Sequence, residues 1–290
     1  MQTSSFSRII SGTMNWGSWG AKMTTTQMED QIKFCVDLGI TTFDHADIYG
    51  GYTTEAEFGR AFYASKIQRD RIQFISKCGI QMPCEARPVS LKYYDYSKTH
   101  IYESIDNTLK ALHTDYIDLL LLHRPSPLLD PEVVAECIQK LFKEGKIKSF
   151  GVSNFTPSQI AVLQQEIKPL WNQIECSLTH EIPFFDGSVD YLKSQNIGVM
   201  AWSPLGSYFK IQNSKTKRIA DSLNALKEKY NCDEDQLLLT WLLKHPSNLY
   251  PVLGTTKSER IKKSFEALKI NLELSDWFLL LQASQGKEVP

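Results

Sequence analysis

Residues 115–124 read DYIDLLLLHR, and this stretch decides the fold class. Residues 116–122 end in four consecutive leucines, and the polar pair His123 and Arg124 follows at once. A strand of a parallel sheet is covered by helices on both faces, so it shows a continuous apolar run rather than a strict alternation. The segment therefore predicts a buried parallel strand with ionisable side chains directly after its carboxyl end.

Outward from this strand, short apolar runs alternate with amphipathic stretches in both directions. We expect strands at residues 9–10, 40–43, 72–76, 116–122, 147–152, 171–174, 199–202 and 250–253. We expect helices at residues 26–38, 55–64, 101–112, 133–143, 189–194, 218–230, 234–243 and 258–268, and a further helix that starts at Thr156 and Pro157. Repeated strand–helix alternation predicts a parallel sheet, and eight units predict closure into one (β/α)8 TIM barrel over residues 1–290.

An open, doubly wound sheet is the structural alternative. That fold would place a glycine-rich phosphate turn after the first strand. No G-x-G-x-x-G follows the predicted strand at 9–10. The sequence therefore favours the closed barrel.

Composition limits the classes of function. The formal net charge of −1 gives no electrostatic reason to expect a nucleic acid or a membrane surface as partner. The six cysteines are scattered, with no C-x-x-C pair and no cysteine–histidine cluster, which predicts reduced thiols and no metal site. Residues 1–11 lack a charged leader with an apolar run, and no apolar run is long enough to cross a bilayer. We expect a cytoplasmic protein.

Ionisable residues gather where the predicted strands end. Asp44 and Tyr49 follow the second strand, Lys77 the third and His123 the fourth. In a barrel these ends lie on one face, and barrel enzymes carry their chemistry there. Taken singly, Asp44 reads as a loop cap, Lys77 as a surface lysine and His123 as a core histidine. Their joint position at neighbouring strand ends favours a functional site instead.

These four side chains suit the protonation of a carbonyl oxygen. A tyrosine is a poor acid at neutral pH, and we expect the Lys77 ammonium to lower the pKa of Tyr49. Asp44 would hold the ammonium in place, and His123 would orient the carbonyl. Such a general acid contributes about 10²–10⁴ in rate. The hydride must come from a cofactor, because no side chain can supply one.

Several segments resemble the aldo-keto reductase family, in its bacterial-type NADP-dependent branch. The resemblance runs from about Ile10 to Leu268. It rests on GITTFDHADIYG (39–50), Ser76-Lys77, DYIDLLLLH (115–123), GKIKSFGVSN (145–154), NQIE (172–175) and AWSPLG (201–206). Asp44, Tyr49, Lys77 and His123 match the family's catalytic tetrad without substitution. The resemblance implies an NADP(H)-dependent reductase of aldehydes and ketones.

The resemblance also implies a cofactor site. Ser153, Asn154 and Gln173 would hold the nicotinamide carboxamide. Trp202 would stack on the ring, and this role is favoured over the alternative of a core aromatic. The remaining implied contacts, to ribose, pyrophosphate and the 2′-phosphate, are Gly12, Thr13, Met14, Asp44, Ser203, Leu205, Ser207, Gly254, Thr255, Lys257 and Arg260.

The C-terminal motif departs from the family pattern. Gly254 replaces the lysine that commonly meets the 2′-phosphate, and Lys263 and Ser264 replace the usual Glu-Asn pair. Arg260 remains, and a guanidinium can stack on adenine and pair with a phosphate. We therefore expect NADP(H) to be preferred, with NAD(H) possible. Lys262 reads as an ordinary solvated helix residue.

The substrate pocket is expected to be mostly apolar. Trp16, Tyr52 and Arg124 are the principal predicted substrate contacts; Trp19, Tyr93, Tyr94 and Tyr96 are further candidates. Arg124 would attract an anionic substrate or pair with a rim carboxylate. The resemblance implies a monomer. Two alternatives stay open: a cofactor-binding regulatory or sensing subunit with little turnover, and a phosphate-binding barrel hydrolase or isomerase, which leaves the lysine–tyrosine pairing without a purpose.

Overall fold

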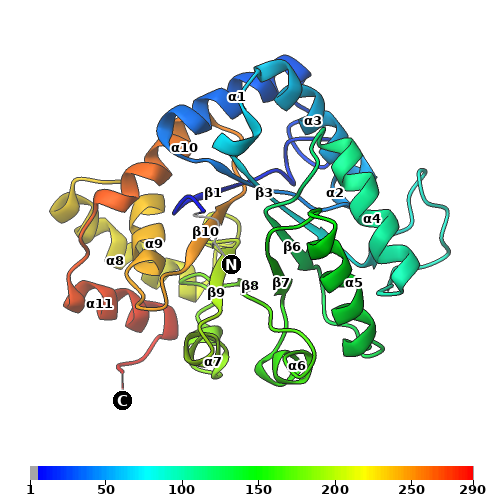
Figure 1. Cartoon of the computed structure of the whole chain (residues 1–290). Helices are drawn as coiled ribbons and strands as arrows, with labels where there is room; N and C mark the ends of the chain where they lie inside the picture. Colours follow the sequence, from blue (N-terminus) through cyan, green and yellow to red (C-terminus); the bar gives the residue numbers. More distant parts are fainter. Residues whose placement is uncertain (1–5, 290) are drawn as a thin grey trace.

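The computed structural model describes residues 6–289, which form one closed barrel of parallel strands with helices around it (Figure 1). The predicted (β/α)8 architecture is confirmed. The barrel strands are β1 (Ile10–Gly12), β2 (Thr42–Asp44), β3 (Gln73–Cys78), β6 (Leu119–Leu122), β7 (Phe150–Ser153), β8 (Trp171–Glu175), β9 (Gly198–Trp202) and β10 (Tyr250–Leu253).

These strands follow one another around the barrel in chain order, and β1 pairs with β10 to close it. The register brings predicted site residues level with one another: Gly12 lies opposite Asp44, and Ser153 lies opposite Gln173. The carboxyl ends of the strands therefore share one rim. Side chains that are far apart in the sequence meet there.

Helices cover the outer face of the barrel. They are α1 (Thr25–Leu38), α3 (Thr54–Ser65), α4 (Lys98–Ala111), α5 (Pro131–Lys143), α6 (Pro157–Leu163), α7 (Ser188–Ser194), α8 (Ser214–Tyr230), α9 (Glu234–Leu243), α10 (Ser258–Glu266) and α11 (Leu274–Gln285). Capping residues decide where these helices begin and end. Thr156 and Gln159 form a capping box before Pro157, and Gly39 ends α1 in the left-handed conformation with a φ of 91°.

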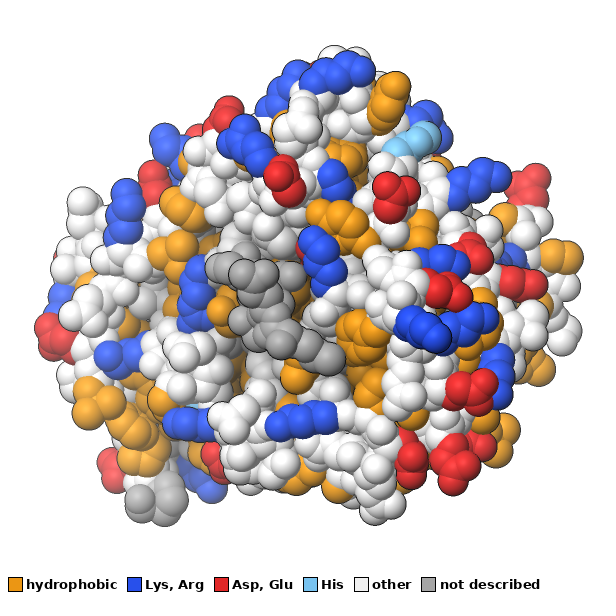
Figure 2. Space-filling view, viewed as in Figure 1, with side chains coloured by type: hydrophobic (Ala, Val, Ile, Leu, Met, Phe, Trp, Pro, Cys, Tyr) orange, Lys and Arg blue, Asp and Glu red, His pale blue; other side chains and the backbone are white. Residues whose placement is uncertain are grey.

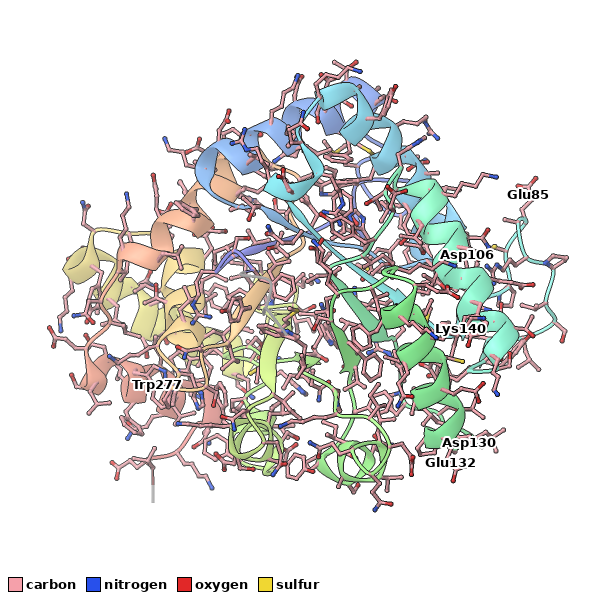
Figure 3. All side chains as sticks on the ribbon, in the orientation of Figure 1. Glu85, Asp106, Asp130, Glu132, Lys140 and Trp277 are labelled. Atoms are coloured by element: carbon pink, nitrogen blue, oxygen red, sulfur yellow. The ribbon has the colours of Figure 1, made fainter. Side chains whose placement is uncertain are left out.

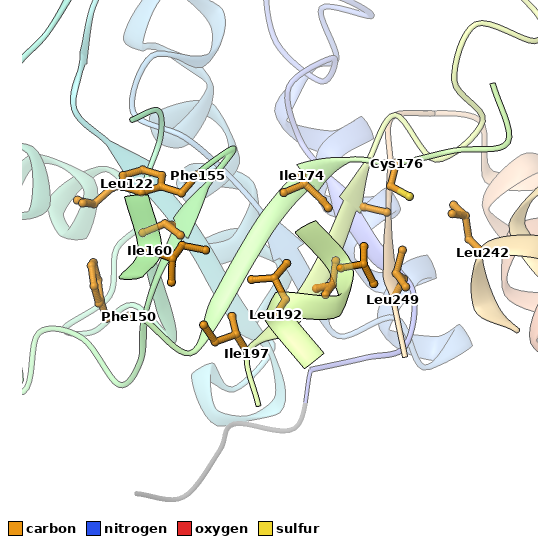
Figure 4. Packing of buried hydrophobic residues seen from close by; sticks show 14 of the residues in the cluster. Leu122, Phe150, Phe155, Ile160, Ile174, Cys176, Leu192, Ile197, Leu242 and Leu249 are labelled. Carbon is orange, nitrogen blue, oxygen red and sulfur yellow. The ribbon is translucent and has the colours of Figure 1, made fainter. Parts of the chain in front are cut away.

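The core has an inner and an outer part. Inside the barrel, Ile75, Leu119, Leu121 and Met200 are buried among one another. Between strands and helices, the larger apolar layer includes Leu122, Phe150, Ile160, Leu192 and Ile197 (Figure 4). Both faces of each strand are thus apolar, which is why the leucine run at 119–122 shows no alternation.

Aromatic rings close the amino end of the barrel. Trp171, the first residue of β8, packs edge-on against Phe6 and Tyr250 at centroid distances of 5.1 and 5.2 Å. The neighbouring strand starts with Gly198, where an added Cβ would come within 2.4 Å of the Trp171 ring. The glycine therefore leaves the space that the indole fills.

Two elements depart from the expectations. A hairpin of β4 (Ile80–Gln81) and β5 (Tyr93–Tyr94) lies between β3 and α4, with Glu85 on the long loop that reaches away from the barrel (Figure 3). Helix α11, labelled through Trp277 in the same figure, packs on α8. The Trp277 and Trp241 rings stack at 5.0 Å, and each indole N–H donates to the other residue's carbonyl oxygen.

Several strands begin later than predicted. Strand β6 starts at Leu119 rather than at residue 116, and a single isolated bridge, between Ile117 and Ile147, precedes it. The centre of the Tyr116 ring lies 4.0 Å from the Arg69 guanidinium and 3.5 Å from the Lys148 ammonium. On the face shown in Figure 2, basic and acidic side chains are interspersed. Across residues 6–289, no helix is both long enough and apolar enough to cross a membrane.

Candidate active site

A cavity of about 660 Å³ opens at the carboxyl ends of the strands. Its lining runs from Tyr49 and His123 at one end, past Ser153, Gln173 and Trp202, to the loop after β10 and the start of α10. This is the rim on which the sequence predicted the chemistry. The residues that line it and were predicted as site residues are Gly12, Met14, Asp44, Tyr49, His123, Arg124, Ser153, Gln173, Trp202, Ser203, Leu205, Gly254, Thr255, Lys257 and Arg260.

Lys77 lies at the centre of a buried polar cluster. Its ammonium donates to Asp44 Oδ2 at 2.7 Å, to the His45 carbonyl oxygen at 2.8 Å and to Tyr49 Oη at 3.0 Å. An ammonium has three donors, so all three are in use. The side chain is 1% exposed, and its ion pair with Asp44 compensates the burial of both charges. Gln173 Nε2 donates to the other carboxylate oxygen of Asp44 at 2.7 Å.

The pKa of Tyr49 differs from the expectation. Burial raises it above the ordinary value, while the Lys77 ammonium pulls it down by a smaller amount. The predicted net lowering is therefore wrong, although the lysine acts in the predicted direction. The phenol stays protonated at neutral pH. Burial alone would lower the pKa of Lys77, but Asp44 and Tyr49 outweigh that effect and raise it, so the amine stays charged.

His123 is a neutral imidazole at the cavity wall. Burial first, and then the positive charges of Lys77, Arg124 and Lys92, hold its pKa well below the ordinary value. Its ring lies edge-on to the Tyr49 ring at a centroid distance of 6.1 Å. Nδ1 is buried and has no hydrogen-bond partner within residues 6–289. A neutral ring beside the phenol can donate a hydrogen bond to a carbonyl oxygen.

A glycine turn presents Tyr49 to the cavity. The short helix α2 (Tyr49–Tyr52) is interrupted by Gly50 and Gly51, whose φ angles are 64° and 68°. An added Cβ at Gly50 would come within 2.4 Å of Thr54 Oγ1. Only glycine adopts this backbone readily in so little space. The turn lets the chain reverse into α3 while the phenol faces Lys77.

The middle of the cavity is a connected set of side chains. Ser153 Oγ donates to the Gln173 carbonyl oxygen, and Asn154 Nδ2 donates to Ser153 Oγ at 2.7 Å. Trp202 Nε1 donates to Asn154 Oδ1 at 2.9 Å, which fixes the indole at the cavity wall. Asn154 itself lies outside the lining. The structure thus places it behind Ser153 and Trp202 rather than at the cavity surface.

The far end of the cavity is basic. Lys257 and Arg260 are exposed and have no carboxylate within ion-pair distance among the residues the structure describes. Gly254 lies opposite Asn15, whose side-chain amide donates to its carbonyl oxygen at 3.0 Å. Lys263 is committed elsewhere, to Asp233 at 2.5 Å. Lys257 and Arg260 therefore offer positive charge beside the open cavity, with Asp235 in the same lining.

Besides Asn154, four of the principal predicted contacts lie outside the cavity lining: Thr13, Trp16, Tyr52 and Ser207. Thr13 is buried, because its hydroxyl bonds to the Asp44 carbonyl oxygen and to His45 Nδ1. Trp16 is 0% exposed and packs on Phe43 in the core, so its prediction as a substrate residue is corrected.

The prediction of Tyr52 as a substrate contact is corrected as well, because this residue lies outside the cavity lining. Its hydroxyl donates to the Ile80 carbonyl oxygen and accepts from the Met82 N–H, so it holds the β4–β5 hairpin. The backbone N–H of Ser207 donates to Thr179 Oγ1, and this residue also lies outside the lining. Of the further candidates, Trp19 lines the cavity and packs at 6.1 Å on the Tyr49 ring.

Sequence reasoning missed two buried acids behind Lys77. Ser104 Oγ donates to Asp47 at 2.7 Å, and Glu55 accepts hydrogen bonds from Ser76 and Thr108. Burial raises the pKa of both carboxyl groups to about 7. Asp47 stands in the quoted 39–50 motif, so a signal existed for it; Glu55 looked like an ordinary first-turn helix residue. Lys92, which lines the cavity, was also missed because the hairpin that carries it was not predicted.

No group of three or more histidine, cysteine, aspartate or glutamate side chains within residues 6–289 is arranged to hold a metal ion.

The barrel and the lysine–aspartate–tyrosine cluster at its rim can be compared with known proteins. The model of the Aldo/keto reductase family matches residues 8–283, so the chain belongs to that family. Membership also implies a nicotinamide cofactor.

Three similar proteins illustrate the relationship. An uncharacterized oxidoreductase, YcsN, of Bacillus subtilis (strain 168) is 40% identical over 98% of this chain and 96% of its own length. A 6-dehydroglucose reductase of Agrobacterium fabrum is 37% identical, again over 98% and 96%. The crystal structure of a Bombyx mori aldo-keto reductase in complex with NADP superposes with a TM-score of 0.75 at 23% identity, covering 95% of this chain and 88% of that one, and it supports the fold.

Proposed function

We propose that this chain reduces aldehydes or ketones to alcohols with NADPH, and that Tyr49 is the proton donor. The observation that carries the proposal is the Lys77 ammonium, which donates at once to Asp44 and to the Tyr49 phenol in a buried site at the cavity floor. A phosphate-binding hydrolase or isomerase on the same fold would leave the lysine–tyrosine pairing without a purpose.

The proton step follows from these contacts. The reduced nicotinamide supplies a hydride to the carbonyl carbon when it is bound. The carbonyl oxygen gains negative charge as that bond forms, and it takes the proton of Tyr49 Oη. The phenolate left behind stands 3.0 Å from a positive charge, which stabilises it. A protonated resting phenol, as burial enforces, is what a proton donor requires.

His123 and Trp202 would position the reactants. The neutral imidazole lies beside the phenol and can bond to the same carbonyl oxygen, which orients the carbonyl toward Tyr49. The Trp202 indole, held by Asn154, offers a flat apolar wall. Ser153 and Gln173 lie on the same side of the cavity and carry the amide and hydroxyl groups that suit a carboxamide.

The preference for NADPH over NADH rests on the basic end of the cavity. Lys257 and Arg260 offer positive charge that no carboxylate of the described residues neutralises, and a 2′-phosphate would supply the missing negative charge. The hydroxyl, amide and basic side chains along the cavity are of the kinds that a nicotinamide dinucleotide needs, which supports the proposal. A cytoplasmic, monomeric enzyme that acts on a small carbonyl compound remains our expectation.

The test is Tyr49→Phe, assayed by NADPH oxidation with 4-nitrobenzaldehyde. We expect turnover to fall by about 10²–10⁴. NADPH binding, followed by the fluorescence of Trp19 and Trp202, should stay close to wild type. Tyr63→Phe, which changes a tyrosine that is 66% exposed, is the matched control. Normal turnover by Tyr49→Phe would refute the proposed acid. Tight NADPH binding by a wild-type protein that turns over none of a panel of aldehydes and ketones would favour a regulatory or sensing subunit.

A further inference from the structure

Two cationic side chains line the cavity at its catalytic end, and the proton step uses neither. Arg124 follows His123 directly, and Lys92 comes from the β4–β5 hairpin. Neither has a carboxylate within 4.0 Å in the part of the chain that the structure describes. Both act on the same ring, because each lowers the pKa of His123. We call this pair the substrate-end cations.

The backbone of Arg124 is held by the hydroxyl of Tyr96. Its backbone N–H donates to Tyr96 Oη at 3.2 Å, and the same hydroxyl donates to the Arg124 carbonyl oxygen at 2.5 Å. Tyr96 is buried, so this anchor is rigid. The guanidinium carbon lies 5.7 Å from the centre of the Trp202 ring, on the cavity side. The contact of the guanidinium with the Trp202 ring restricts the side chain and so reduces the entropy that it loses when it binds a ligand.

The acids of the cavity do not neutralise this pair. Asp44 is occupied by Lys77 and Gln173. Asp235, the other acid of the lining, also lines an adjoining cavity together with Lys257 and Arg260, at the opposite end. The region around Tyr49 and His123 therefore presents positive charge to whatever enters. A cleft of one sign attracts ligands of the other sign.

We propose that the carbonyl substrate carries an oxyanion group, a carboxylate in the simplest case, which Arg124 binds while Lys92 contributes longer-range attraction. This inference rests on the proposed function, since it specifies the substrate of that site. A planar guanidinium pairs with a carboxylate through two parallel hydrogen bonds. Such a pair would orient the carbonyl at the far end of the substrate toward the Tyr49 phenol.

The test compares an acid with its own ester. The probes are 4-carboxybenzaldehyde and methyl 4-formylbenzoate, which share the aldehyde and differ in charge. We expect the wild type to favour the acid in kcat/KM by about 10-fold or more, the value of one hydrogen bond to a charged group. Arg124→Met should bring the acid-to-ester ratio close to one. Arg124→Lys should retain part of the ratio, and Lys92→Met should lower it about 2- to 3-fold.

A binding measurement separates the proposed reductase activity from the proposed binding of an oxyanion by Arg124. Each probe is titrated into protein saturated with NADP⁺, and the fluorescence of Trp19 and Trp202 reports occupancy. If the ester is reduced but acid and ester bind and react alike, the reductase stands and the anion site is overturned. If neither probe is reduced but the acid alone binds, and Arg124→Met abolishes that binding, the anion site stands and the reductase fails.

The control variant is Lys168→Met. Lys168 is exposed and precedes β8, at the amino end of the barrel, so its removal changes net charge by the same amount without touching the cavity. We expect its acid-to-ester ratio to equal that of the wild type. An Arg124→Met protein that keeps the wild-type ratio but binds NADPH more weakly would overturn the proposal and assign Arg124 to the cofactor.

Discussion

The two ends of the cavity are built in opposite ways. At the catalytic floor, which we define as Asp44, Tyr49, Lys77 and Gln173, the side chains are buried and bonded to one another. At the basic end, Lys257 and Arg260 are exposed and make no ion pair within residues 6–289. The floor is complete before any ligand arrives, whereas the basic end holds charge that only a ligand would neutralise.

This difference separates two kinds of mutational effect. A change at the floor leaves a buried group without its partner, so it damages the folded state as well as the chemistry. A change at the basic end removes an exposed charge, which the fold does not need. We therefore expect variants of the catalytic floor to lower the stability of the protein, and variants of the basic end to weaken ligand binding without lowering stability.

The largest effect is expected for Lys77→Met. Removal of the ammonium leaves the Asp44 carboxylate buried beside Gln173 alone, so the free energy of unfolding should fall by about 3–5 kcal/mol. Denaturant unfolding followed by circular dichroism measures it. The double variant Asp44→Asn/Lys77→Met removes both charges and should regain much of the loss. If Lys77→Met were as stable as the wild type, the claim that the catalytic floor supports the folded state and the basic end does not would be wrong.

The next effect concerns the basic end. Arg260→Ala should raise the Kd for NADPH by about 10- to 100-fold, the value of a hydrogen bond to a charged group, and leave the Kd for NADH nearly unchanged. Thermal unfolding of the apo protein should not change. Lys262→Ala, on the same helix, is the matched control. Equal losses for NADPH and NADH would instead indicate that Arg260 contacts the shared part of the dinucleotide.

The third effect is a pH dependence, and it comes from the layer behind the floor. The pKa values of Asp47 and Glu55 are raised to about 7 by burial, from ordinary values of 3.8 and 4.5. The unfolded chain therefore releases these protons at lower pH, so stability is present below about pH 4 and is lost as the pH rises through 7. Between pH 5 and pH 8 these two carboxyl groups therefore lower the free energy of unfolding, while the buried neutral imidazoles of His45 and His123, whose pKa values are held low, raise it.

The matched variant for this pH dependence is Glu55→Gln, which removes one ionisation and keeps the shape of the side chain. Relative to the wild type, the variant should lose less free energy of unfolding, or gain more, between pH 5 and pH 8. A variant whose stability falls more steeply than that of the wild type over this range would contradict the raised pKa of Glu55.

The strand ends were the predictable part of this molecule. Periodicity located the eight barrel strands to within a few residues, because parallel strands buried on both faces leave a distinct apolar run. The quoted motifs then placed Asp44, Tyr49, Lys77 and His123, and the structure brings these four side chains together.

The sequence could not show in which direction a side chain points or how deeply it is buried. Trp16 and Tyr52 stand near the predicted rim in sequence, yet one ring packs into the core and the other supports a hairpin. The sign of the Tyr49 pKa shift was missed for a related reason: the cost of burial depends on every neighbouring atom, and sequence spacing reveals only the lysine.

The aromatic closure around Trp171 has a kinetic consequence. Because Phe6 and Tyr250 pack against that indole at the amino end, we expect ligands to enter and leave the cavity at the carboxyl ends of the strands. Two ligands bound there together would then share one entrance, and ordered association and release is the kinetic behaviour to expect.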